Sequence, residues 1–126
     1  MTLPVNARVQ AVRHFANRLE AAHALLRKGG NATADARFDT LLARLNEARE
    51  HLRWNPAAGR PARFLAAQST QNQALVARAL TIAAAHDRPE LRELVIKPHV
   101  LLYAHGKDRV LLISLRHERE LEFRLE

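Results

Sequence analysis

The last third of the chain carries three short apolar runs, at residues 94–96, 100–104 and 110–115. Short runs that are rich in β-branched residues and bounded by breaks are typical of β-strands. The break at residues 105–108 contains a glycine, and it predicts a hairpin between the second and third strands. Pro98 separates the first run from the second, because proline cannot donate to a central ladder. The sequence therefore predicts an antiparallel sheet at the C-terminal end.

Apolar residues before the sheet recur every three or four positions, which is typical of amphipathic helices. They predict helices over residues 12–28 and 34–53, which the Gly29-Gly30 pair joins into an antiparallel hairpin. Alternation over residues 5–9 predicts a short strand, and a capping pattern predicts a further helix over residues 70–86. We therefore expect an α+β fold. Its N-terminal strand and helical hairpin pack on a C-terminal antiparallel sheet, with an inserted third helix.

Length and composition limit the class of protein. The chain has 126 residues, of which 48% are hydrophobic and none is cysteine. This length fits a single domain over residues 1–126, and the lack of cysteine excludes disulfides and thiolate metal sites. His14, His23 and His51 have no ligand partner at helical spacing, so we expect no metal and no cofactor. No apolar run reaches the roughly 20 residues that span a bilayer, so we expect a cytoplasmic protein without a membrane partner.

Positive charge is concentrated in the predicted helical part. Residues 1–89 hold 13 Lys/Arg against 6 Asp/Glu, a difference of +7, whereas residues 90–126 hold 7 of each. An uneven positive field favours polyanions or an acidic protein partner. The alternative is that the genome's base composition favours arginine and alanine codons.

Several short motifs occur in an order that resembles the RelE/ParE toxin superfamily. Trp54-Asn55-Pro56 and Gly59-Arg60-Pro61 follow the second helix and resemble the family's "P..GR" segment. Tyr103 and His117-Glu118-Arg119 stand in the last strands where the family has "Y-V-(I/L)-x-Y" and "H-x-R". The resemblance touches about two thirds of the chain. The segment at residues 66–87 is longer than the family's usual loop, which is why we expect an inserted helix there.

The resemblance implies the toxin of a type II toxin–antitoxin system. ParE-like members inhibit DNA gyrase and need no catalytic residues, whereas RelE-like members cut mRNA on the ribosome. Both are neutralised by a cognate antitoxin whose C-terminal segment wraps the toxin. We expect a ParE-like inhibitor of growth, as a homodimer or a toxin–antitoxin hetero-oligomer. The alternatives are a RelE-like endoribonuclease and a non-toxic basic protein-interaction module.

A nuclease without a metal would need an acid, a base and cations that hold phosphate. His117 is the candidate acid or base, Arg116 and Arg119 are candidate phosphate ligands, and Tyr103 could stack on a base. A regular strand would point Arg116 and His117 to opposite faces of the sheet. The alternative for His117 is a strand-end residue that is paired with a neighbouring glutamate.

A partner site is expected on the sheet, because its central strands are apolar on both faces and the helical hairpin can cover only one. Strict alternation predicts that the odd-numbered apolar residues of the last two strands share one face and the even-numbered ones the other. The second face then depends on the inserted helix or on a partner.

The candidate residues for binding a target or an antitoxin are Arg60, Leu101, Tyr103, Ile113 and Leu115. The alternative for Arg60 is a structural role, in which it anchors its own loop.

Overall fold

The protein is described by a computed structural model, which covers residues 6–28, 34–61, 77–78, 81–82 and 90–118. These residues form two helices and a five-stranded sheet, and the predicted α+β class is confirmed. The elements in chain order are β1 (Arg8–Ala11), α1 (Arg13–Lys28), α2 (Ala34–Trp54), β2 (Arg60–Pro61), β3 (Glu90–Ile96), β4 (His99–His105) and β5 (Arg109–His117).

The strands lie in the order β1-β5-β4-β3-β2. The predicted antiparallel arrangement is confirmed for β3, β4 and β5, while β1 pairs with β5 in parallel and makes the sheet mixed. The N-terminal strand begins at Arg8, later than predicted, because Ala7 N donates to Arg53 O (2.7 Å) and its ladder with β5 starts only afterwards. The two-residue β2 was predicted as loop, since its proline and the preceding glycine are typical of loops.

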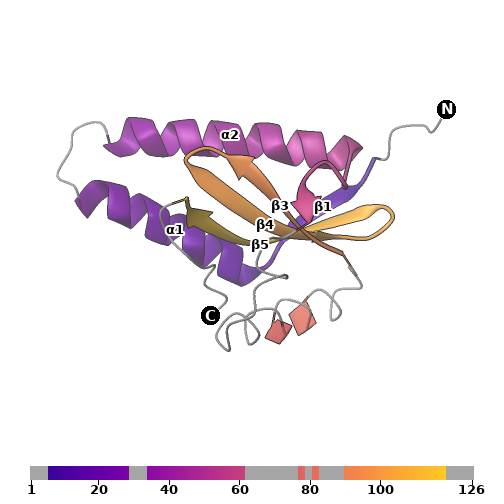
Figure 1. Ribbon diagram of the computed structural model, residues 1–126. Helices are drawn as coiled ribbons and strands as arrows, with labels where there is room; N and C mark the ends of the chain where they lie inside the picture. The colour runs from indigo at the N-terminus through magenta and orange to yellow at the C-terminus, as the bar shows by residue number, and fades with distance from the viewer. Residues whose placement is uncertain (1–5, 29–33, 62–76, 79–80, 83–89, 119–126) are drawn as a thin grey trace.

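The helices α1 and α2 form the predicted hairpin and lie side by side on one face of the sheet (Figure 1). His23 joins them, because its ring stacks on Phe38 at 4.0 Å and its Nε2 lies 3.0 Å from Asp35 Oδ1. Asp35 in the first turn of α2 also suits the positive end of the helix dipole. The buried core residues on this face are Ala7, Phe15, Leu41, Leu45, Leu52, Leu101, Tyr103, Val110, Leu112 and Leu115.

The opposite face of the sheet is also buried. Val12 and Ile82 pack against its core, and Ile82 belongs to a pair of residues in helical conformation. Residues 77–78 are helical too, while the rest of the helix predicted over 70–86 lies outside the described residues. The expectation of an uncovered apolar sheet face is therefore wrong. The core residues on this face are Leu91, Val100, Leu102, Ala104, Leu111 and Ile113.

A β-bulge divides strand β5. Leu102 pairs with Ser114 but Tyr103 pairs with Leu112, so Ile113 has no counterpart in β4. An extra residue shifts the alternation of the strand by one position. The odd-numbered residues of β5 therefore change faces at the bulge: Ile113 lies away from the helices and Leu115 lies under them. The prediction that odd-numbered residues share one face is wrong for this reason.

Candidate functional site

A cleft of about 870 Å³ opens between α1, α2 and one end of the sheet. We call it the hairpin cleft. Its apolar floor includes Leu26, Leu41 and Leu115, which come from α1, α2 and β5. Leu25 also lines it and is 65% exposed, which is unusual for a side chain of this size. The cleft therefore offers apolar contact area to a binding partner.

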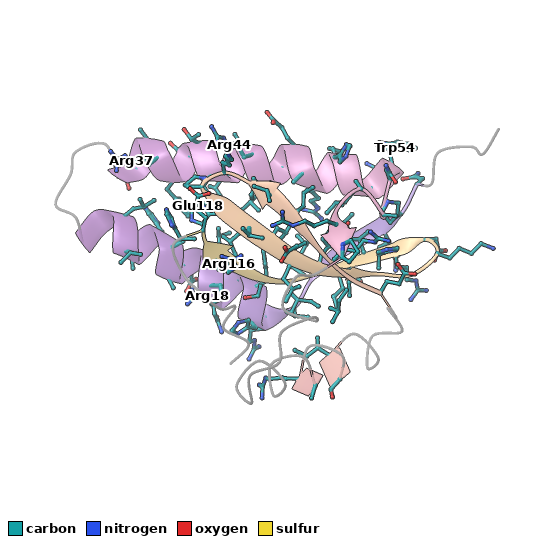
Figure 2. All side chains as sticks on the ribbon, in the orientation of Figure 1. Arg18, Arg37, Arg44, Trp54, Arg116 and Glu118 are labelled. Atoms are coloured by element: carbon teal, nitrogen blue, oxygen red, sulfur yellow. The ribbon has the colours of Figure 1, made fainter. Side chains whose placement is uncertain are left out.

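Cations surround this apolar floor. Arg18 of α1, Arg37 and Arg44 of α2 and Lys97 of the β3–β4 turn line the cleft, and the arginines are labelled in Figure 2. The described residues that line it include no aspartate or glutamate. Arg44 Nη1 also donates to Lys97 O, which ties α2 to the turn. The arrangement favours a ligand that carries acidic groups on an apolar body.

Two histidines lie at the strand end of the cleft. His99 and His117 are register partners on β4 and β5, and their rings meet edge to face with centroids 5.3 Å apart. Both line the hairpin cleft, where His99 is buried and His117 half-buried. The structure thus places the predicted acid or base beside a second imidazole, His99, which was not predicted from the sequence.

The other predicted catalytic residues do not join His117. Arg116 pairs with Val100, a residue of the opposite face, and its Nη1 donates to His117 O (3.5 Å). Tyr103 is fully buried and does not line the cleft. Arg119 lies outside the described residues. The predicted opposition of Arg116 and His117 across the sheet agrees with this register.

Tyr103 instead fixes the loop between α2 and β2. Its hydroxyl donates to Pro56 O (2.7 Å) and accepts from Gly59 N (2.9 Å). Burial raises the pKa of the phenol, while the Gly59 hydrogen bond and the charge of Arg92 act in the opposite direction. A Cβ at Gly59 would lie 2.6 Å from Glu93 O and 2.7 Å from the Tyr103 hydroxyl. Only glycine fits at this position, because any side chain would collide with the backbone of β3 and with the ring of Tyr103.

Arg60 belongs to the same region. Its Nε donates to Glu93 Oε1 (2.7 Å), and the Glu93 side chain is only 1% exposed. Arg92 adds bonds from Nη1 to Gly59 O (2.9 Å) and from Nε to His105 Nε2 (3.0 Å). These contacts agree with the alternative for Arg60, an anchor of its loop, while its binding role stays a prediction.

Most residues of the hairpin cleft were not predicted from the sequence. Arg37 and Arg44 are seven residues apart, a spacing that places them on the same helical face, so this pair could have been found. Lys97 and His99 flank the turn proline and carry no periodic signal. Their position in the cleft depends on the pairing of β4 with β5, which the sequence does not specify.

Two classes of site receive no support. Within the described residues, no group of three or more histidine, aspartate or glutamate side chains is placed to hold a metal ion. Neither α1 nor α2 is long and apolar enough to cross a membrane.

Known proteins resemble this chain in fold and not in sequence. No family model matches it, and no curated protein does either. A chain from the solved structure described as "Chromosomal ParDE TA system from P. aeruginosa" matches with a TM-score of 0.56 and 13% identity. The match covers 89% of this chain and 96% of that one. The two chains share a fold. The resemblance seen in the motifs is thus supported at the level of architecture.

Proposed function

We propose that this chain is the toxin of a type II toxin–antitoxin pair and inhibits growth by binding an essential protein target, with DNA gyrase as the first candidate. The fold shared with a chain of a ParDE system carries the proposal. The ordered motifs around Trp54, Gly59, Tyr103 and His117 support it from the sequence.

The hairpin cleft is the proposed contact for the cognate antitoxin. Its cations and apolar floor complement an amphipathic segment whose polar face is acidic. Complementary charge also speeds association, which suits an antitoxin that must capture its toxin quickly. Leu115 is the predicted binding residue that lines this cleft. The buried Leu101 is the register partner of Leu115 and would support the site from beneath. Tyr103 lies under the α2–β2 loop and Ile113 on the opposite face of the sheet, so neither belongs to this proposed contact.

Expression in a bacterial host tests the toxin proposal. Induced expression of this chain alone should arrest growth, and co-expression of the product of the adjacent reading frame should restore it. Growth at the normal rate, with soluble protein confirmed by blotting, would contradict the proposal and favour a non-toxic interaction module.

A second assay separates the two toxin mechanisms. A gyrase inhibitor should block supercoiling by purified gyrase while ribosome-bound mRNA stays intact. An endoribonuclease is the second candidate, because His99 and His117 face each other in a cationic cleft. Cleavage of mRNA at defined codon positions, lost in His117→Ala, would replace gyrase inhibition as the proposed activity.

A further inference from the structure

A second cleft lies against the other half of α2. It has a volume of about 520 Å³ and is lined by polar residues of α2 and by the start of β1, among them Asn6, Arg8, Asn46, Arg49, Glu50 and Arg53. We call it the β1 cleft. It shares no lining residue with the hairpin cleft. A ligand here would therefore contact other residues than those of the proposed antitoxin contact.

The β1 cleft has an excess of positive charge. Glu50 is the only acidic residue among the described residues that line it, and its Oε1 lies 3.5 Å from Arg53 Nη1. Arg53 Nε donates to Asn6 Oδ1 (2.7 Å), so this guanidinium is held in place. Arg49 makes one long hydrogen bond to Val9 O (3.4 Å), and Arg8 is exposed. Arg8 and Arg49 therefore have donors available for an anionic ligand.

An exposed aromatic side chain, that of Trp54, comes directly after Arg53 in the sequence. Trp54 is the only tryptophan in the chain and is 46% exposed at the end of α2 (Figure 2). The Arg53 guanidinium carbon lies 5.5 Å from the centroid of its ring. Because Ala7 N donates to Arg53 O (2.7 Å), the start of β1 is held against this end of the helix. The indole thus lies beside Arg53, which lines the β1 cleft together with Arg8 and Arg49.

We propose that the β1 cleft and Trp54 bind single-stranded nucleic acid. An unpaired base stacks on the indole, and Arg8 and Arg49 hold the flanking phosphates. Aromatic platforms beside arginines are the usual means of binding single strands, because every base has a π face. The side-chain amides of Asn6 and Asn46 can accept or donate hydrogen bonds to a base or sugar. A double helix would not offer a base to Trp54. An acidic protein would not need the planar ring. This activity goes beyond the proposed toxin function and does not depend on it.

The test uses the full chain and labelled oligonucleotides of about eight nucleotides, a length within the usual range of such sites. RNA and DNA of one sequence are titrated separately by fluorescence anisotropy. If RNA and DNA bind with equal affinity, the protein recognises only the bases and the phosphates. Tighter binding of RNA would indicate an additional contact to the 2′-hydroxyl. Since Trp54 is the single tryptophan, its fluorescence should also be quenched as the unlabelled strand binds.

Substitutions distinguish the contribution of base stacking to the binding affinity from the contribution of charge. We expect Trp54→Leu to weaken binding about tenfold, the usual scale for losing a stacked base, and Trp54→Phe to retain most of the affinity. Arg49→Ala should reduce the slope of log affinity against log salt by about one. Arg13→Ala is the charge-matched control, because Arg13 is exposed on α1 and lines neither cleft. Urea unfolding verifies that each variant is folded.

Three results with oligonucleotides would overturn the proposal. The first is binding by the wild-type chain without tryptophan quenching, and the second is equal affinity of Trp54→Leu and Trp54→Phe. The third is an equal loss of affinity in Arg13→Ala and Arg49→Ala, which would reduce binding to non-specific attraction. Poly-glutamate that displaces the oligonucleotide and quenches Trp54 equally would assign the cleft to an acidic protein instead.

Discussion

At the scale of single residues, Tyr103 shows how one buried polar atom can organise a loop. Its hydroxyl satisfies Pro56 O and Gly59 N, two backbone groups that the irregular loop leaves without helix or strand partners. A buried group that loses its partner costs the free energy of its desolvation. The phenol is therefore a structural requirement of the α2–β2 connection.

Tyr103→Phe tests this role through pH. The substitution should lower the free energy of unfolding at neutral pH by about 1–3 kcal/mol, because it leaves buried backbone groups unpaired. Burial raises the pKa of the folded phenol above its usual 10.0. The unfolded chain therefore loses this proton first, and wild-type stability should fall as pH rises through 10. Tyr103→Phe should lack this component of the decline.

Urea unfolding between pH 8 and pH 11 gives the two stability curves. Tyr103 is the only tyrosine, so tyrosinate absorbance also reports its ionisation directly in the folded wild type. Parallel stability curves for the two proteins would show that burial does not perturb the phenol.

The sequence could select Tyr103 but not its function. Its position in a recognisable strand motif made base stacking a reasonable hypothesis. The hydrogen-bond partners lie 44 and 47 residues earlier in the chain, in a segment whose path the sequence does not specify. Local patterns report which residues are apolar or aromatic, whereas such a contact depends on the complete fold.

At the scale of elements, the Arg60–Glu93 pair joins β2 to β3. These residues are also register partners in the ladder, so the ion pair reinforces the shortest strand of the sheet. Glu93 is almost fully buried, while the Arg60 side chain is 37% exposed. A buried carboxylate stays favourable only while it is paired.

Arg60→Ala should therefore destabilise the protein by about 2–4 kcal/mol, because it leaves a buried charge without its partner. The double variant Arg60→Ala/Glu93→Gln should recover part of that loss, since it removes the charge. Thermal unfolding of Arg60→Ala, Glu93→Gln, the double variant and the wild type measures both effects. A double variant as unstable as the sum of its single changes would mean that the pair contributes no coupling.

The elements also show where sequence patterns stop being informative. Periodicity predicted both helices within one or two residues and the antiparallel order of the three long strands, because long apolar patterns have few other solutions. The predicted assignment of β5 side chains to the two faces of the sheet was wrong, because a bulge at Ile113 moves the alternation by one residue. Nothing in the apolar run from Val110 to Leu115 marks the residue that has no counterpart in β4.

At the scale of the whole molecule, the charge asymmetry of the sequence becomes a spatial one. Cations of α1, α2 and the β3–β4 turn converge on the hairpin cleft, although they are far apart in the chain. The field there extends beyond any single contact, and it would act on an acidic partner before docking.

The effect of the positive field at the hairpin cleft on association can be measured by reversing the charge of an exposed arginine. If the proposed antitoxin docks in the hairpin cleft, Arg37→Glu should slow its association several-fold at low salt, because charges at the rim of an interface act mainly on the association rate. Arg13→Glu changes the net charge equally but lies outside the cleft, and it should have the smaller effect. Stopped-flow mixing at two salt concentrations gives the rates. Equal slowing by both variants would place the effect in net charge alone.

The pairing of β1 with β5 also bears on how the protein is made. Arg8 lies beside Arg109, so the first strand emerges from the ribosome long before its partner exists. Closing a loop of this length precedes any gain from the ladder, and contacts so distant in sequence generally slow folding. Strand β1 must remain unpaired with β5 during synthesis of α1, α2 and the rest of the sheet. Translation that stops before β5 leaves both β1 and β4 without their shared neighbour, so a shortened product could not complete the fold.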